Sequence, residues 1–189
     1  MRQLAQQLTL HMPLDATHTA GVRLAAVAAV FRVIAGEPEL LFIKRAIVEH
    51  DPWSGHIAFP GGRIEPGDDT LEDTAVRETR EELALDLSNG ELLGRLDDIA
   101  PRSRTLPAII VRPYVAVVSA NVTFVPSREV AATFWVPLSV LRSPDTQSEH
   151  VMMINGVRAR FPAYRVEEHM VWGLTERIVR QLLTLLDSQ

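Results

Sequence analysis

Three glutamates, Glu78, Glu81 and Glu82, have the spacing in this sequence that most directly suggests chemistry. In a helix they lie at positions i, i+3 and i+4, so their carboxylates share one face. Like charges at this spacing weaken an isolated helix by about 0.2–0.5 kcal/mol per pair. A divalent cation would offset the repulsion, because carboxylate oxygens are suitable ligands for Mg²⁺ or Mn²⁺. Taken alone, the pattern also fits a solvated acidic helix face, which is the more common role of such charges.

The residues before these glutamates provide a loop and a helix start. Gly61-Gly62 follows Pro60 at the end of a predicted strand, and glycines allow the backbone to approach a metal or a phosphate closely. Asp69 is the predicted helix N-cap, with Glu72 completing a capping box, and the helix is predicted to run to about residue 83. We expect a neighbouring face of this helix to pack on a sheet through Ala75, Val76, Thr79 and Leu83.

Hydrophobic periodicity and turn residues predict the remaining elements. Helices are expected at 2–10, 137–141 and 173–186, and strands at 22–34, 40–45, 57–59, 92–97, 108–119, 133–136, 150–154 and 157–161. Turns are expected at 36–39 and at Asn155-Gly156, the latter joining a hairpin, and 50–55 is predicted to be a loop. This order predicts an α/β (α+β) fold in which helices pack on a mixed central sheet, in a single domain spanning residues 1–189.

Composition narrows the classes of function. The chain of 189 residues has 47% hydrophobic residues, a formal charge of −5 and no cysteine. The missing cysteines exclude disulfides, thiolate–zinc sites and cysteine nucleophiles, and the negative charge argues against nucleic acid as a partner. The N-terminus lacks the apolar core of a signal peptide, and the longest apolar stretch, 24–34, is too short to span a bilayer. We therefore expect a cytoplasmic protein without a membrane partner.

The stretch from Gly61 to Leu85 resembles the sequence box of the Nudix hydrolases, G-x5-E-x7-R-E-U-x-E-E-x-G-U, where U is aliphatic. Gly62, Arg77-Glu78 and Glu81-Glu82 match this box, as does Leu85. Asp68 takes the place of the first glutamate, and eight residues instead of seven separate it from Arg77. The chain also departs from the box at Thr79, where an aliphatic residue is expected, and at Ala84, where glycine is expected. The resemblance implies a Nudix-like α/β/α sandwich.

One branch of that family, the coenzyme A pyrophosphatases, has a longer box preceded by G-Q-x-x-F-P-G-G. The segment 55–62 reads GHIAFPGG, with His56 in place of glutamine. Residues 40–46, LLFIKRA, resemble that branch's L-L-x-x-x-R-S/A stretch, and 112–115 and 172–175 resemble its later landmarks. The loop from Ile47 to Ser54 matches no part of the branch's pattern.

The resemblance assigns roles to individual residues. It implies that Glu78 and Glu82 are ligands of Mg²⁺ or Mn²⁺, that Glu81 is a ligand or a partner of a bridging water, and that Gly61 lends a carbonyl. Arg77 would orient a carboxylate of the site by a charge-assisted hydrogen bond, and Asp68 would stabilise the junction of loop and helix. The alternatives are a turn glycine for Gly61, a surface ion pair for Arg77 and a helix cap for Asp68.

Further candidates lie outside the box. Glu129 resembles a position that supplies an extra acid in some Nudix proteins and is the candidate base; the alternative is a solvated loop glutamate. Arg102 and Arg104, beside two prolines, are candidates to bind phosphate bidentately, or else are solvated loop residues. Arg45, His56 and Arg63 complete the predicted substrate-binding set.

The implied function is metal-dependent hydrolysis of a pyrophosphate bond in a nucleotide-type small molecule. Within the family the coenzyme A resemblance favours coenzyme A or its thioesters, giving 3′,5′-ADP and 4′-phosphopantetheine. The alternatives are ADP-ribose, dinucleotide polyphosphates or nucleoside triphosphates as substrates, a non-catalytic Nudix-fold nucleotide sensor, and a non-enzymatic domain with an acidic surface helix. A G-x-S-x-G elbow and the Walker and Rossmann glycine fingerprints are absent from the sequence. The assembly is expected to be a monomer or a homodimer.

Overall fold

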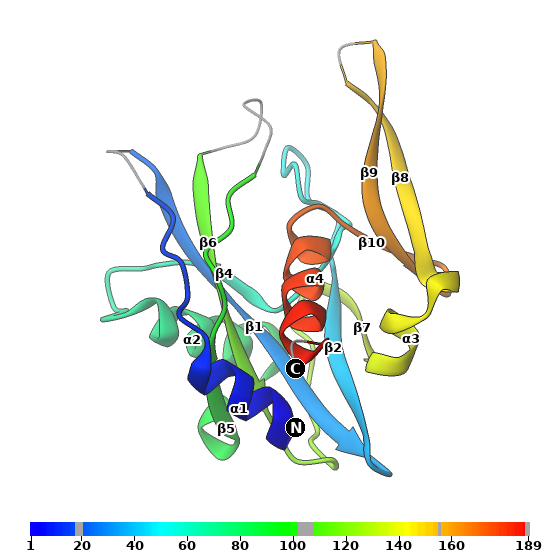
Figure 1. Cartoon of the computed structure of the whole chain (residues 1–189). Coiled ribbons are helices and arrows are strands. Elements are labelled where there is room, and N and C mark those ends of the chain that lie inside the picture. The colour runs from blue at the N-terminus through cyan, green and yellow to red at the C-terminus, as the bar shows by residue number, and fades with distance from the viewer. Residues whose placement is uncertain (18–20, 102–107, 155, 188–189) are drawn as a thin grey trace.

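The computed structural model describes residues 1–17, 21–101, 108–154 and 156–187 (Figure 1). The helices are α1 (Arg2–Leu10), α2 (Leu71–Leu83), α3 (Leu138–Arg142) and α4 (Gly173–Asp187), and the 3-10 turns are η1 (Leu87–Asn89) and η2 (Pro144–Thr146). The strands are β1 (Arg23–Ile34), β2 (Glu37–Arg45), β3 (Ile57–Ala58), β4 (Gly61–Arg63), β5 (Glu91–Arg95), β6 (Ile109–Val117), β7 (Val130–Pro137), β8 (Gln147–Ile154), β9 (Val157–Val166) and β10 (His169–Trp172).

The larger sheet is mixed and has β1 and β2 at its centre. Strand β1 runs parallel to β6, and the other described pairings in the sheet are antiparallel. One half of β1, 31–34, pairs with β2, while its other half pairs with β4 at 25–27. The far end of β2, at 43–44, pairs instead with β3, and the other edge of β2 pairs with β7 from residue 39 to residue 45. The segment 57–63 therefore lies between the diverging ends of β1 and β2.

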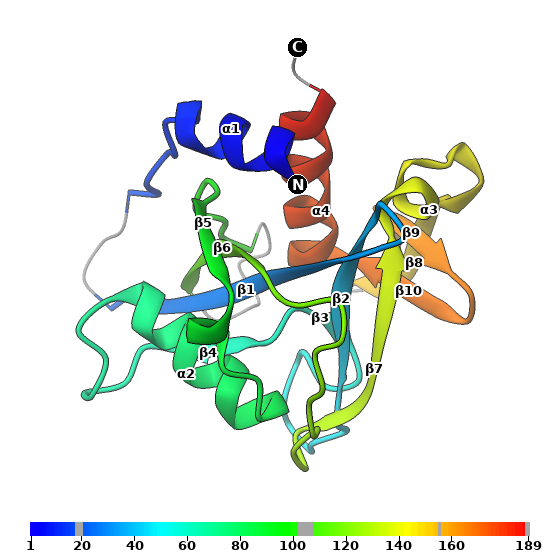
Figure 2. The same ribbon diagram turned by 90° about the horizontal axis from the view of Figure 1, so that it is seen from below.

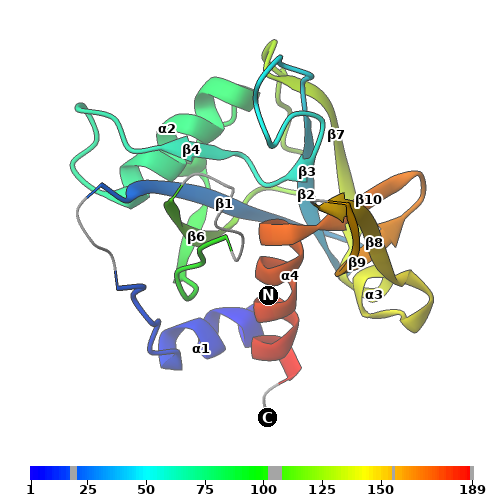
Figure 3. The same cartoon turned by 90° about the horizontal axis from the view of Figure 1, so that it is seen from above.

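Two layers of helix cover this sheet, as Figures 2 and 3 show from opposite sides. Helix α2 lies on one face, where Ala75 and Leu83 join a buried cluster with Val30, Leu41 and Ile43. Helices α1 and α4 lie on the other face. The predicted α/β/α sandwich with a mixed sheet is confirmed.

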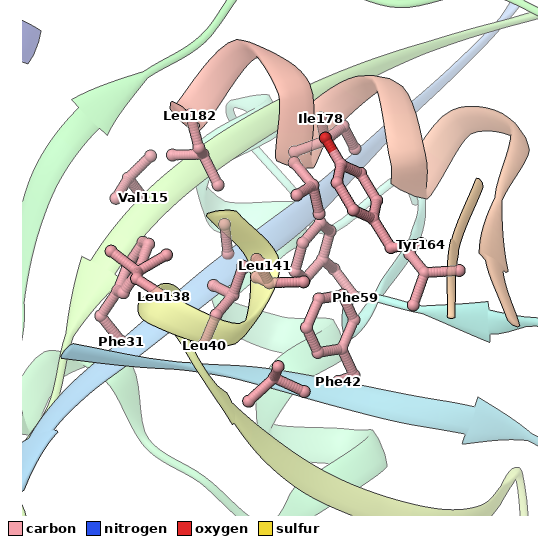
Figure 4. Packing of buried hydrophobic residues seen from close by; sticks show 14 of the residues in the cluster. Phe31, Leu40, Phe42, Phe59, Val115, Leu138, Leu141, Tyr164, Ile178 and Leu182 are labelled. Atoms are coloured by element: carbon pink, nitrogen blue, oxygen red, sulfur yellow. The ribbon is translucent and has the colours of Figure 1, made fainter. Parts of the chain in front are cut away.

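The core on the α4 side is the larger one and joins most of the chain's elements. Figure 4 shows Phe31, Leu40 and Phe42 from the sheet packed with Leu141, Tyr164 and side chains of α4. Phe42 stacks on Phe59 with ring centroids 5.1 Å apart. Phe59 directly precedes Pro60 and the two glycines, so this stacking fixes the base of the loop that leads into β4.

A second sheet of three strands, β10-β9-β8, was not predicted as a unit. The hairpin of β8 and β9 projects from the body of the molecule in Figure 1. It confirms the predicted hairpin, with longer strands, and Asn155 of its turn lies outside the described residues. Strand β10 has four residues, too few for an alternating pattern to reveal it.

The start of α2 differs from the prediction by one residue. Thr70, and not Asp69, is the N-cap: its hydroxyl accepts a hydrogen bond from the Asp73 backbone N–H, and the Asp73 carboxylate accepts one from the Thr70 N–H. The predicted box of Asp69 and Glu72 is therefore wrong. Both pairs have the spacing of a capping box, and the sequence pattern does not choose between registers one residue apart.

Other boundaries also moved. Glu37–Glu39 belong to β2, so the predicted turn at 36–39 is confined to residues 35–36, where both residues have positive φ. Gly61–Arg63, predicted as the loop after a strand, form β4 against β1. Within the described residues, no helix is long and apolar enough to cross a membrane.

Helix α2 ends at Ala84, which adopts the left-handed conformation with φ 52° and ψ 25°. Ala84 thus adopts the left-handed conformation that glycine usually adopts at a helix end, although its Cβ makes this conformation unfavourable.

We predict that A84G raises the free energy of unfolding by about 0.5–1 kcal/mol, because relief of the left-handed strain exceeds the entropy that glycine adds to the unfolded chain. Urea unfolding of both proteins measures the difference. A75G, in the right-handed interior of the same helix, is the control and should lose about 1 kcal/mol or more. Equal losses in both variants would contradict the prediction.

Candidate active site

The Glu82 carboxylate lies between α2 and the glycine loop and is only 3% exposed. Its Oε2 accepts a hydrogen bond of 2.9 Å from the Gly61 backbone N–H. Burial raises the Glu82 pKa to about 7, although that hydrogen bond and the charge of Arg45 act in the opposite direction. A carboxylate held in this way is unfavourable without a cation, so this residue is a strong candidate for a ligand.

Glu78 lies one turn earlier, directly above the second glycine. A Cβ on Gly62 would be 2.2 Å from Glu78 Oε1, so only glycine leaves room for this carboxylate. Burial raises the Glu78 pKa, and Arg77 counteracts that effect. The two glycines thus have distinct roles. The Gly61 N–H donates a hydrogen bond to Glu82, and the absence of a Cβ at Gly62 leaves space for the Glu78 carboxylate.

Arg77 connects the acidic face to the loop before the helix. Its Nε and Nη2 donate to the two oxygens of Asp68 at 2.9 Å each, and Nη2 also donates to the Arg63 carbonyl at 2.9 Å. Its Nη1 donates to Glu78 Oε1 and Glu81 Oε2 at 3.0 Å each. The guanidinium beside Asp68 holds the pKa of that carboxyl far below its usual range. The ion pair therefore ties the turn preceding α2 to the helix.

The three glutamates of the predicted acidic face are not equivalent. Glu82 is buried, the Glu78 side chain is 15% exposed, and the Glu81 side chain is 58% exposed. The charge of Glu78 raises the Glu82 pKa, while the charges of Glu81 and Glu129 raise the Glu78 pKa. The structure thus pairs Glu78 with Glu82 and places Glu81 at the rim.

Glu129 is brought to the same place by a loop bound to the end of α2. The Ser127 backbone N–H donates to the Glu82 carbonyl at 2.7 Å, and the Ala46 N–H donates to the Glu129 carbonyl at 2.8 Å. The exposed Glu129 carboxylate raises the pKa values of both Glu78 and Glu82. An additional acid therefore lies near the pair, where the sequence predicted one.

Arg45 stands at the end of β2, and its charge lowers the Glu82 pKa. Its guanidinium forms an ion pair of 2.9 Å with Asp51. His56 lies nearby, with its ring centroid 4.9 Å from that of Trp172, and burial lowers the His56 pKa. The sequence analysis did not identify Asp51, which lies in the loop that matches no part of the coenzyme A branch's pattern.

The remaining candidates fare differently. Arg63 is exposed, and the contact it makes with the site runs through its carbonyl. Arg102 and Arg104 lie outside the described residues. Trp172 is partly exposed, and the His150 ring stacks on it with centroids 4.1 Å apart.

The donors around Glu82 suit a hard cation. Among the described residues, no three His, Asp or Glu side chains are grouped closely enough to hold a metal alone. Mg²⁺ commonly takes one or two carboxylates and completes its shell with water and substrate phosphate oxygens. Two desolvated carboxylates, Glu78 and Glu82, beside a glycine loop fit this requirement. The arrangement can hold a divalent cation and, through it, a polyanionic substrate.

Comparison with known proteins identifies the class. The NUDIX domain model matches residues 23–154. The protein "Uncharacterized Nudix hydrolase NudL" of Yersinia pestis (strain Pestoides F) is 35% identical over 149 residues, covering 77% of this chain and 71% of NudL. The same protein of Yersinia pseudotuberculosis matches to the same extent.

Solved structures share the fold. A MutT/nudix family protein from Enterococcus faecalis superposes with a TM-score of 0.60 at 15% identity, covering 100% of this chain and 70% of its own. A C. elegans Ap4A hydrolase in a binary complex gives 0.53 at 23% identity, covering 62% and 82%. The NUDIX domain of Shewanella oneidensis NrtR, complexed with ADP ribose, gives 0.51 at 25% identity, covering 74% and 87%.

The chain belongs to the Nudix family and is a hydrolase of pyrophosphate bonds. The resemblance drawn from the box at 61–85 is thereby confirmed.

We predict that Glu82 makes the metal-free protein less stable as pH rises. Its pKa is about 4.5 unfolded and about 7 folded, so between these values the folded protein binds more protons and loses stability with rising pH. Relative to E82Q, wild-type protein should lose on the order of 2 kcal/mol between about pH 5 and about pH 8. Urea unfolding with a chelator measures this, and a difference independent of pH would contradict it.

We also predict that G62A lowers kcat by on the order of 100-fold, because the added methyl group displaces the Glu78 carboxylate. G67A is a matched control: a Cβ there meets no atom within 4 Å. Hydrolysis rates of both variants, with circular dichroism to verify folding, test this. Full activity in G62A would show that the position of Glu78 is unimportant.

Proposed function

We propose that this Nudix enzyme hydrolyses the pyrophosphate bond of coenzyme A or its thioesters in a reaction that requires Mg²⁺ or Mn²⁺. The products would be 3′,5′-ADP and 4′-phosphopantetheine. The observation that carries the hydrolytic part is the buried Glu82 carboxylate, bound to the Gly61 N–H beside Glu78. The choice of coenzyme A rests on the segment 55–62 and on the longer box.

In this proposal Glu78 and Glu82 hold the cation, with the Gly61 carbonyl as a third donor. Glu81, exposed on Arg77, serves as an outer partner through water. A divalent cation supplies charge neutralisation of the diphosphate and a lower pKa for the attacking water. Arg77 keeps Glu78 oriented through the 3.0 Å hydrogen bond from its Nη1.

Glu129 is the proposed base. It lies on a loop that is hydrogen-bonded to the end of α2, and its exposure leaves room for water and substrate. It takes a proton as the water oxygen forms a bond to one phosphorus, and the bond from that phosphorus to the bridging oxygen breaks. Arg45 and His56, with Arg63, Arg102 and Arg104 as further candidates, would contact the departing and remaining phosphates.

The longer box is compatible with an intact junction. Despite the additional residue between Asp68 and Arg77, the two side chains form a bidentate ion pair at 2.9 Å. The Asp68 side chain, shorter than the glutamate of the usual box, thus still binds Arg77 although one more residue separates the two. This supports placing the chain with the coenzyme A branch, which shares the longer spacing.

The runner-up within the same chemistry is ADP-ribose, a dinucleotide polyphosphate or a nucleoside triphosphate. ADP-ribose is favoured among these because the NUDIX domain of NrtR, a structural relative at 25% identity, is described in complex with it. Function as a sensor without catalysis is disfavoured by the Glu78–Glu82 pair, which a purely binding domain does not require.

Incubation with coenzyme A, acetyl-coenzyme A, ADP-ribose, Ap4A and nucleoside triphosphates, each with Mg²⁺ in H₂¹⁸O, tests the substrate. We expect the highest kcat/KM for coenzyme A or its thioester, and mass analysis of the products should locate ¹⁸O on one phosphate. If kcat/KM for coenzyme A is far below that for ADP-ribose, ADP-ribose replaces coenzyme A as the proposed substrate. Binding with no product from any of these compounds would favour a sensor.

We predict that E82Q lowers kcat by on the order of 1,000-fold at saturating Mg²⁺, since it removes a charged ligand. E72Q, an exposed position in the first turn of the same helix, should change kcat less than about 2-fold. Steady-state kinetics with a Mg²⁺ titration measures both effects. Unchanged turnover and Mg²⁺ dependence in E82Q would overturn the assignment.

A further inference from the structure

We infer that Asp51 is a positioning residue, which holds the Arg45 guanidinium where it contacts the diphosphate of the substrate. The inference rests on the proposed function only in that a diphosphate binds beside Glu78 and Glu82; it does not depend on coenzyme A. The sequence predicted that Arg45 binds substrate, and it pointed to no role for Asp51.

The backbone of Arg45 is fixed on both sides. Its N–H donates to the His56 carbonyl at 3.0 Å, and on the other edge of β2 it pairs with Val130 after a bulge between residues 44 and 45. The next residue, Ala46, donates to the Glu129 carbonyl at 2.8 Å. Since the loop before Val130 is itself hydrogen-bonded to the end of α2, the start of the Arg45 side chain has a set place relative to Glu82.

The far end of the side chain is held by Asp51. Arg45 Nη2 lies 2.9 Å from Asp51 Oδ2, while Asp51 Oδ1 accepts a hydrogen bond of 3.0 Å from the Trp53 N–H. Both oxygens are thus engaged, and the Asp51 side chain is only 20% exposed. The Ser54 hydroxyl accepts a further bond of 2.7 Å from the Val48 N–H, which closes the loop. The carboxylate is therefore a rigid anchor.

One donor of this held guanidinium has no partner. Arg45 Nε is the one buried side-chain nitrogen or oxygen, among the described residues, that lacks a hydrogen bond. A buried donor without an acceptor is unfavourable, and such a group in a folded protein calls for an explanation. A phosphate oxygen is a suitable acceptor, because arginine binds phosphates through charge-assisted hydrogen bonds.

The charges around Arg45 agree with this assignment. It acts electrostatically on Glu82 as well as on Asp51 and His56. Glu78, Glu82 and Glu129 make the neighbourhood strongly acidic, so a polyanion needs a fixed cation there in addition to any metal. Asp51 engages Nη2 and so keeps the guanidinium in place, while Nε is left without a protein partner.

Residues 47–54 match no part of the coenzyme A branch's pattern, so a role for Asp51 does not follow from that resemblance. The alternative is that the ion pair of Arg45 and Asp51 only fastens the loop. In that case Asp51 would matter for stability, and its effect on binding would not depend on the presence of Arg45.

A double-mutant cycle separates the two roles. The probe is methylenediphosphonate, a diphosphate analogue that is not hydrolysed, with Mg²⁺ at a fixed concentration, and affinity is measured by calorimetry. The proteins are wild type, D51N, R45M, D51N combined with R45M, and the control E49Q. Glu49 lies in the same loop, with an 89% exposed side chain.

We expect D51N and R45M each to weaken binding by about 10-fold, as loss of a charge-assisted hydrogen bond predicts. In the R45M background D51N should add less than about 2-fold, because Asp51 acts through Arg45. E49Q should bind like wild type. R45K keeps the charge and lacks the guanidinium, so it should also bind about 10-fold more weakly. This variant tests the contact between the guanidinium and the diphosphate even if D51N fails to fold, and R45K binding like wild type would contradict the inference.

Three further results would overturn the inference: D51N binding as well as E49Q, D51N weakening binding equally with and without Arg45, or wild type failing to bind the diphosphonate. A separate hydrolysis assay of the same proteins keeps the two proposals apart. Hydrolysis of ADP-ribose instead of coenzyme A would change the substrate and leave the role of Asp51 intact. If wild type and D51N hydrolyse coenzyme A with equal kcat/KM, the proposed substrate stands and the role of Asp51 is contradicted.

Discussion

The hydrogen bond from the Gly61 N–H to the Glu82 carboxylate is the contact on which the rest of the site depends. It draws a charged group into an almost fully buried position between a helix and a strand, where the group's pKa rises to about 7. One backbone hydrogen bond does not compensate for the lost hydration of a carboxylate, so this part of the molecule is arranged at a cost to stability. Such a cost is typical of functional sites, and it makes cation binding and folding mutually supportive.

The sheet creates the position that this contact requires. Because β1 pairs with β2 through one half and with β4 through the other, the two central strands diverge and admit residues 57–63 between them. A Cβ on Gly61 would come within 2.3 Å of the Ala26 carbonyl, so β4 can lie this close to β1 only with glycine there. The Phe42–Phe59 stack anchors the same segment from the opposite core. Packing on the α4 side thus determines where the carboxylates on the α2 side meet the backbone.

The sequence was sufficient where the chemistry is local to one element. Helical spacing predicted that Glu78, Glu81 and Glu82 share one face, and the box gave Arg77 a carboxylate to orient and Asp68 a place at the loop–helix junction. The ion pair between Arg77 and Asp68 emerged only from the structure. It failed where a choice depends on tertiary contacts: the three glutamates look alike in sequence, yet only packing decides that Glu82 is buried and Glu81 exposed. The N-cap at Thr70 and the short strands β4 and β10 were missed for the same reason. Asp51 was missed because its partner lies across a loop whose conformation no periodicity encodes.

Arg77 and Arg45 illustrate two ways of placing a cation near acidic groups. Arg77 is saturated: Asp68, Glu78, Glu81 and a carbonyl occupy its donors, so it can orient side chains but has little capacity left for a ligand. Arg45 has one carboxylate partner and a buried Nε with none. Guanidinium groups of the first kind stabilise the architecture of a site, whereas those of the second kind are prepared for an incoming anion. Substitution by lysine should therefore be damaging at both positions for different reasons, because lysine replaces neither the several simultaneous bonds of Arg77 nor the directed Nε of Arg45.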